Sequence, residues 1–149
     1  MTQSMARRMP AAYRHKGVWR GVYRHIDAEG RTLDVHESRV EVLFPEEGDW
    51  DYVQRNHFTW PNGREARAEL PAVYRDGALW WDTQTFSGRA WETEDGAVLL
   101  NLDRKDEPGA SFFEIILMGA DDHHRSRTWH WFKDGKLYKR TLCEERRSG

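Results

Sequence analysis

The sequence predicts an all-β fold, a single antiparallel up-and-down barrel of about eight to ten strands that follows a short N-terminal lead-in. Turn signals recur at short intervals, and the segments between them are rich in β-branched and aromatic residues. Eight tryptophans in 149 residues lie mostly in those segments, beside polar neighbours. The turn signals stand at residues 27–30, 46–49, 61–63, 75–77, 94–96, 107–109, 119–124 and 133–136.

The chain is expected to form one domain. A length of 149 residues with 38% hydrophobic content suits a single core built from few, large side chains. Residues 1–16 are polar and rich in alanine, so we expect a flexible or short helical segment there. Residues 17–146 carry the strand and turn patterns without a linker, and we expect them to form the barrel.

The composition argues against several classes of partner. Charged residues make up 32% of the chain with a net charge of −2 and no basic stripe, so nucleic acid is not expected. No window approaches the roughly 20 apolar residues of a membrane span, and residues 1–10 lack the apolar stretch of a signal peptide. Cys143 is the only cysteine, which excludes an intrachain disulfide. We expect a cytoplasmic protein with no membrane partner.

The last hairpin carries the clearest local signal. The Asp-Gly pair at 134–135 is typical of a two-residue type I′ turn. Such a turn places Trp131 opposite Tyr138 and Trp129 opposite Arg140, on one aromatic and cationic face. We expect this face to line the interior of the barrel.

Residues 112–118 form a strand that is apolar on both faces apart from Glu114. Such a strand is expected to be covered on both sides. The outer cover could be the N-terminal segment, a helix or a second copy of the protein, because a large exposed apolar strip is unusual on a monomer. A homodimer is therefore a candidate assembly.

Residues 17–21 on the first strand, Arg140 on a late strand and the meander between them resemble the calycin superfamily of lipocalin-like barrels. The extended pattern also resembles a calycin-like family. In the lipocalin pattern a late arginine stacks on the first-strand tryptophan, a cation–π contact of about 0.5–2 kcal/mol. The resemblance thus implies that Trp19 and Arg140 have a structural role and close the barrel floor. Its other landmarks lie at residues 44–45, 52–56, 60–64, 79–82 and 127–132.

Strand alternation identifies the candidate ligand-binding residues. Polar side chains that alternate with inward apolar ones are expected inside the barrel, where they could orient a ligand. The alternative is that the amides only satisfy one another. The Trp80-Trp81 pair has opposite orientations, and we favour Trp81 inside. The candidates are Tyr23, Gln54, Asn56, Trp60, Trp81, Arg127, Trp129, Trp131 and Tyr138.

Two side chains are candidate catalytic groups if the protein is an enzyme. His36 shares the inward face of its strand, and Glu114 lies in the least polar segment of the chain. Burial without a partner would make Glu114 a general acid or base, whereas pairing with Arg127 or Arg140 would make it a structural ion pair.

We predict no metal site and no cofactor. The seven histidines show no metal-ligand spacing along the chain, and the adjacent His123 and His124 lie in a polar loop. Haem bound by His130 is a minor alternative, because the hairpin places that side chain outward. Cys143 is expected on the outer face, and no nucleophile elbow is present.

Two functions follow from these residues. The first is a cytoplasmic lipocalin-like protein that binds a small aromatic or carbonyl-bearing molecule, with Arg127 available to pair a ligand carboxylate. The second is a cofactor-free lyase, isomerase or cyclase that uses proton transfer by His36 or Glu114. The sequence favours the first, although a barrel of this type hosts both kinds of function.

Overall fold

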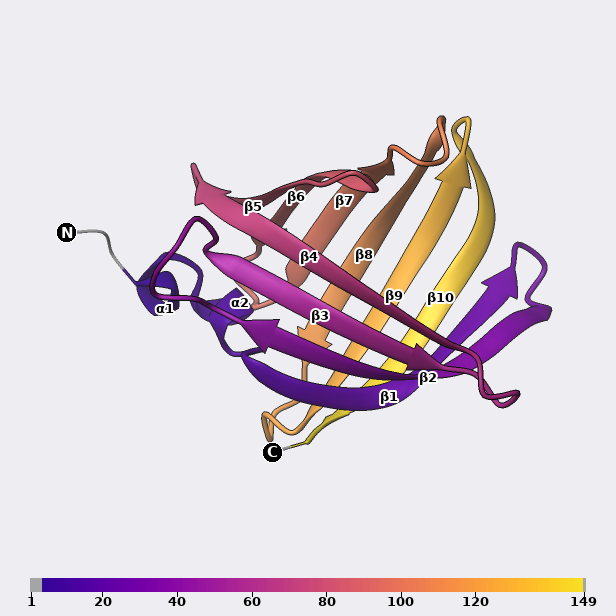
Figure 1. Cartoon of the computed structure of the whole chain (residues 1–149), viewed down its shortest axis with the longest axis horizontal. Coiled ribbons are helices and arrows are strands. Elements are labelled where there is room, and N and C mark those ends of the chain that lie inside the picture. The colour runs from indigo at the N-terminus through magenta and orange to yellow at the C-terminus, as the bar shows by residue number, and fades with distance from the viewer. Residues whose placement is uncertain (1–3, 149) are drawn as a thin grey trace.

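The computed structural model describes residues 4–148 and shows a closed antiparallel barrel in which each strand pairs with its sequence neighbours and β1 pairs with β10 (Figure 1). The predicted fold class is confirmed, with ten strands. Two short helices precede them. The elements are α1 (Met5–Arg8), α2 (Pro10–Tyr13), β1 (Gly17–Asp27), β2 (Thr32–Leu43), β3 (Tyr52–Thr59), β4 (Glu65–Arg75), β5 (Ala78–Asp82), β6 (Phe86–Glu92), β7 (Val98–Arg104), β8 (Ala110–Met118), β9 (His124–Lys133) and β10 (Lys136–Arg147).

Every turn predicted from the sequence joins two strands. The type I′ turn of the last hairpin is present, since Asp134 and Gly135 both have positive φ, at 50° and 79°. The connection between β5 and β6 at residues 83–85 was not predicted, because it contains neither glycine nor proline. There the Thr83 hydroxyl accepts hydrogen bonds from the backbone N–H groups of Thr85 and Phe86, at 3.1 and 3.0 Å.

The two helices lie at one end of the barrel (Figure 1). Met9 and Ala12 are buried in the core, and the ring of Tyr13 packs against Phe44 at 5.0 Å between centroids. The N–H of Ala12 donates to the carboxylate of Glu92 at 2.9 Å. The N-terminal segment therefore packs on an end of the barrel where β6 finishes and β1 begins. No helix in residues 4–148 is long and apolar enough to cross a membrane.

Strand β8 has one buried and one exposed apolar face. Phe112, Glu114 and Ile116 point inward and are buried. Ile115 and Leu117 point outward and are 38% and 48% exposed. Neither helix provides the cover that the sequence predicted for this strand, since both lie at the end of the barrel. A second copy of the chain as the cover stays a prediction.

The predicted pairing of β9 with β10 is wrong by one residue. A register shift between Leu137 and Lys139 places Lys139 opposite Trp131. Beyond it, Thr141 pairs with Trp129, where the sequence predicted Arg140. The one-residue shift exchanges the two faces of β10, because side chains alternate with period two. It turns Thr141, Cys143 and Glu145 inward and Arg140 outward.

Candidate functional site

The barrel interior contains a cavity of about 270 Å³ towards the end opposite the helices. Its wall is mostly aromatic and aliphatic with a few polar groups, the usual composition of a small-molecule site. Nine side chains selected from the sequence line it, namely Tyr23, His36, Gln54, Asn56, Trp81, Glu114, Arg127, Trp129 and Trp131. The remaining lining residues are His25, Phe58, Ala68, Leu70, Phe86, Leu100, Leu102, Phe112 and Lys139.

Three tryptophans form much of the apolar wall. Trp81, Trp129 and Trp131 are all buried, and their inward direction follows from strand alternation. The indole N–H of Trp131 donates to the Thr141 hydroxyl at 2.8 Å, so this polar atom is satisfied within the wall. The ring of Phe112 packs on Trp131 at 4.7 Å between centroids. These contacts hold the rings in place around the cavity.

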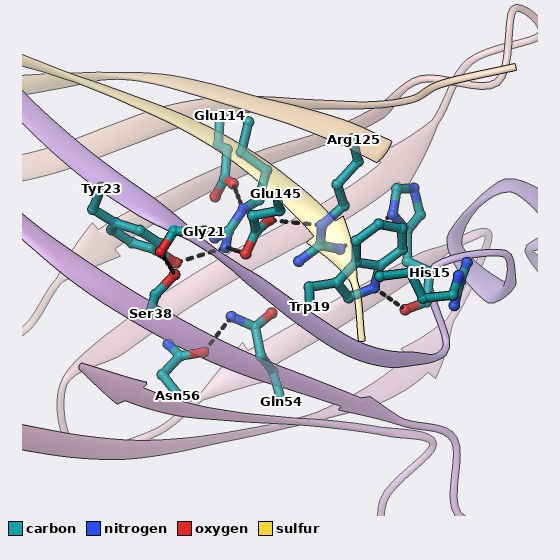
Figure 2. A network of polar contacts seen from close by, with 12 residues as sticks. His15, Trp19, Gly21, Tyr23, Ser38, Gln54, Asn56, Glu114, Arg125 and Glu145 are labelled. Carbon is teal, nitrogen blue, oxygen red and sulfur yellow. Dashed lines mark hydrogen bonds and ion pairs between the residues drawn. The ribbon is translucent and has the colours of Figure 1, made fainter. Parts of the chain in front are cut away.

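A buried ion-pair network lies at the inner end of the cavity, where Figure 2 shows Glu114, Glu145 and Arg125 near one another. Arg127 Nε donates to Glu114 Oε2 at 2.8 Å, and Arg127 Nη1 donates to the Tyr23 hydroxyl at 2.6 Å. Arg125 Nε donates to Glu145 Oε1 at 2.7 Å, and Glu145 Oε2 lies 3.5 Å from Arg127 Nη1. Two arginines thus face two glutamates, and the network is balanced in formal charge.

This network changes the interpretation of three candidate residues. Of the two alternatives for Glu114, the structure shows the ion pair with Arg127. Arg127 Nε and Nη1 are held by Glu114 and Tyr23, and its availability to a ligand carboxylate stays a prediction. Burial lowers the pKa of Arg127, but Glu114, Tyr23 and Glu145 outweigh this and hold that pKa well above its ordinary value. Burial raises the pKa of Tyr23 well above its ordinary value.

Trp19 is fully buried at the helix end of the barrel, and its indole N–H donates to the backbone carbonyl of His15 at 2.9 Å (Figure 2). The guanidinium carbons of Arg125 and Arg147 lie 4.6 and 4.4 Å from the ring centroid. The expected cation–π contact is therefore present, but the prediction that Arg140 makes it is wrong. Arg147 stands opposite Trp19 in the sheet, whereas Arg140 lies seven residues away, about 23 Å along the strand.

Two histidines meet at the other end of the cavity. His25 Nε2 lies 3.2 Å from His36 Nε2, and His25 Nδ1 lies 2.7 Å from the Thr141 hydroxyl. His36 Nδ1 is 3.3 Å from the backbone carbonyl of Glu37, which can only accept, so we assign its proton to Nδ1. His36 Nε2 is then an acceptor, and His25 Nε2 carries the proton between the rings.

Burial disfavours the charged form of both rings. Burial first, and then the nearby charges of Lys139 and His36, lower the pKa of His25 to about 4, with Asp34 opposing. Burial also lowers the pKa of His36. The Asp34 carboxylate lies beside the two imidazoles, and the three residues offer donor atoms that all lie within 4.8 Å of one another. Sequence spacing missed this cluster, because its members come from two strands.

Lys139 is a cavity residue, although the predicted hairpin register would place it outward beside His130. The register shift in β10 turns it inward, and its Nζ lies 4.4 Å from the centroid of the Trp131 ring. Burial lowers the pKa of Lys139. Within residues 4–148 it makes no ion pair, in contrast to Arg127. Lys139 is thus a cavity cation that can pair with a ligand.

The two predicted amides form a chain along β3. The Tyr52 hydroxyl donates to Gln54 Oε1 at 2.8 Å. Gln54 Nε2 in turn donates to Asn56 Oδ1 at 2.9 Å (Figure 2). The side-chain amide of Gln54 therefore has hydrogen-bond partners within the protein. This agrees with the alternative that the predicted amides only satisfy one another. The Asn56 amide stands at the cavity end of the chain and keeps its N–H donors.

Two predicted ligand-binding residues lie outside the cavity lining. Trp60 packs its ring on His36, 4.6 Å between centroids, and donates its indole N–H to Asp34. It borders a separate surface hollow beside Pro61. Tyr138 lies in the register shift of β10, half-buried beside Lys139. Alternation predicted both as interior residues, but Trp60 follows the end of β3 and Tyr138 falls where alternation is interrupted.

The fold resembles that of several solved structures. No model of a known protein family and no curated protein matches the chain. An S-type phycobiliprotein lyase, CPES, from Guillardia theta aligns over 93% of this chain and 90% of its own, with 15% identity and a TM-score of 0.73. A protein of unknown function from the DUF3598 family of Nostoc punctiforme aligns over 92% of this chain, with 17% identity and a TM-score of 0.69.

The present chain spans about half of the Nostoc protein, 49% of its length. A third structure, EF1p2_mFAP2b bound to DFHBI, aligns over 97% of this chain and 100% of its own, with 14% identity and a TM-score of 0.50. At these identities the likeness concerns the fold alone. The chain has a lipocalin-like barrel fold of ten strands.

Proposed function

We propose that the barrel binds a small aromatic molecule that carries an anionic or carbonyl oxygen. The observation that carries this proposal is the cavity of about 270 Å³ with tryptophans in its wall and the amine of Lys139 beside them. An aromatic ligand would gain apolar contact with Trp81, Trp129 and Trp131. Its oxygen would offset the cost of burying the unpaired Lys139 ammonium.

The polar groups of the cavity favour oxygen acceptors over cationic ligands. Lys139 and the Asn56 amide both offer N–H donors at the wall. The carboxylate of Glu114 also lines the cavity, but Arg127 already neutralises it. A ligand cation would therefore meet Lys139 without a free carboxylate to balance it.

The comparisons support a small-molecule role only through the fold. One similar structure is that of a phycobiliprotein lyase, and another was solved with DFHBI bound. Barrels of this size have an interior able to hold one small ligand. We also propose that the chain belongs to the calycin superfamily and acts in the cytoplasm, on the barrel likeness and the single cysteine.

The cofactor-free enzyme has less support than the binding protein. Glu114 is engaged by Arg127, and the Nε2 atom of His36 faces His25 instead of open cavity. Neither of the two predicted catalytic groups is therefore free to transfer a proton to a ligand in the cavity. We therefore favour binding without turnover.

The test is a titration with 8-anilinonaphthalene-1-sulfonate, an aromatic anion whose fluorescence rises in apolar sites. Ala68 lines the cavity but is exposed, so Ala68→Trp can fill the opening without overpacking the core. We expect this variant to lose affinity about tenfold or more. Arg67→Trp, on the outer face of the same strand, is the matched control and should bind as the wild type does.

Lys139→Met tests whether the Lys139 ammonium binds the ligand's oxygen. Removal of a charge-assisted hydrogen bond should lower the affinity for the anionic probe about 10- to 100-fold. The affinity for uncharged N-phenyl-1-naphthylamine should fall much less. Equal binding by the wild type, Ala68→Trp and Arg67→Trp would show that the probe does not enter the barrel and would overturn the proposal.

A further inference from the structure

We propose that His25, Asp34 and His36 bind a divalent first-row transition-metal ion, with Zn²⁺ as the best match, at the opening of the barrel. One donor atom from each residue lies within 4.8 Å of the other two. Two imidazoles and a carboxylate are a ligand set suited to such ions. This site is additional to the proposed aromatic-ligand function and does not depend on it.

The spacing of the two imidazoles fits one shared ion. Two nitrogens bound to zinc at about 2.0–2.1 Å with a tetrahedral angle lie about 3.3 Å apart. His25 Nε2 and His36 Nε2 are 3.2 Å apart. The two rings therefore need little movement to coordinate a single ion, and the Asp34 carboxylate is the third donor within reach.

Strand pairing brings the three residues together. In the antiparallel ladder of β1 and β2, His25 stands directly opposite Asp34. His36 follows two residues after Asp34 on the same face of β2. Directly opposed and diagonal neighbours on one face of a sheet lie within side-chain reach. The cluster is thus a cross-strand feature that no spacing within a single segment reveals.

Each donor residue is also held by an outer hydrogen bond. His25 Nδ1 meets the Thr141 hydroxyl at 2.7 Å, and His36 Nδ1 meets the backbone carbonyl of Glu37 at 3.3 Å. The indole N–H of Trp60 donates to both Asp34 oxygens, at 3.1 and 3.0 Å. Metal-binding histidines commonly have such partners on the second ring nitrogen, which orient the ring.

The hydrogen bonds also accommodate the change of tautomer that binding needs. In the arrangement assigned above, His25 carries its proton on Nε2, towards His36. Coordination requires that proton to move to Nδ1, where the Thr141 oxygen can accept it while also accepting from Trp131. The ring stays neutral, and no further base is required.

The arrangement leaves a coordination position for a ligand. Three protein donors around zinc leave a fourth position, as in open zinc sites. His25 and His36 both line the cavity, so the ion would stand beside the proposed ligand site. Asp34 offsets part of the added charge, whereas Lys139 opposes it. An oxygen of the bound molecule could occupy the open position.

The test is calorimetric titration of the chelator-treated full chain with Zn²⁺, together with the visible absorption of bound Co²⁺. We expect one ion per chain and the d–d bands of a four-coordinate site. His25→Asn should abolish binding. Asp34→Asn, which keeps the side-chain size, should weaken it at least tenfold, and Trp60→Phe should weaken it about 10- to 100-fold through the lost outer contact.

His57 and His124 supply the controls, because each lies beside a carboxylate elsewhere in the barrel, at Glu65 and Asp121 respectively. His57→Gln and His124→Gln should leave Zn²⁺ affinity unchanged. Loss of binding in His124→Gln with retention in Asp34→Asn would locate the ion in the 119–124 loop and overturn the proposal. Absence of Co²⁺ bands in the wild-type chain would overturn it without recourse to any variant.

Discussion

The carboxylate of Glu114 accepts a hydrogen bond from Arg127 Nε at 2.8 Å, inside the barrel and between the cavity and the buried Trp19 end. Both side chains are buried, and Arg127 also holds the Tyr23 hydroxyl and approaches Glu145. The inner end of the cavity is therefore formed by a buried ion-pair network, and the aromatic side chains line the rest of the wall. Loss of one charge would leave its partner buried without compensation.

Glu114→Gln should destabilise the fold by about 3–5 kcal/mol, because it leaves a buried arginine short of a counter-charge. The free energy of unfolding in urea measures the effect. Glu69→Gln is the matched control, since Glu69 pairs with Arg55 at 3.2 Å while both side chains are more than half exposed. That variant should lose less than about 1 kcal/mol. Similar losses in the two variants would contradict a structural role for the buried pair.

Stability should fall between pH 7 and pH 5 through His15. Burial, and then the charges of Arg125 and Arg127, lower the pKa of His15 to about 2, whereas the unfolded chain titrates near 6.5. The unfolded state then binds one more proton than the native state as the pH falls through 6.5. The stability that neutral His15 provides above pH 6.5 is therefore lost progressively on acidification.

His15→Gln removes this titration. Between pH 7 and pH 5 the wild type should lose about 2 kcal/mol more than the variant, measured by urea unfolding at each pH. Parallel pH profiles for the two proteins would show that His15 is not held neutral in the native state.

Cys143 should be inert in the native protein. The thiol is buried, and burial raises its pKa well above the ordinary value, so the reactive thiolate is scarce. Ellman's reagent should react with it only after unfolding. The control is Leu142→Cys in the Cys143→Ala background, because Leu142 is the outward neighbour and is 39% exposed. If Cys143 reacted as quickly as this control, the observed register of β10 would be wrong.

The outer face of β8 is predicted to contact a second copy of the chain. Ile115 and Leu142 face outward and both pair with Thr128 of β9, so they form an apolar row across three strands. Sedimentation velocity should show a dimer at high protein concentration, and Ile115→Lys should shift it to monomer. Leu33→Lys, at another exposed apolar position, should not. A wild-type chain that stays monomeric at high protein concentration would contradict the predicted contact between two copies.

The sequence by itself determined the barrel and much of its lining. Turn residues divided the chain into strands, and period-two alternation then oriented Tyr23, His36 and Gln54 inward, because each strand has one face in the core. The same rule left Glu114 undecided, since its choice of partner depends on which residue of β9 lies opposite. Local pattern thus defines faces within a strand and says little about contacts between strands.

Only the tertiary structure decided which cation enters the cavity and which histidines meet at its opening. One extra residue in β10 brought Lys139 into the cavity and moved Arg140 out, although the turn at 134–135 was predicted correctly. The approach of His25 to His36 depends on the pairing of β1 with β2. Register shifts and cross-strand neighbours arise from the closure of the whole sheet, so no short segment encodes them, whereas turns and alternation are local.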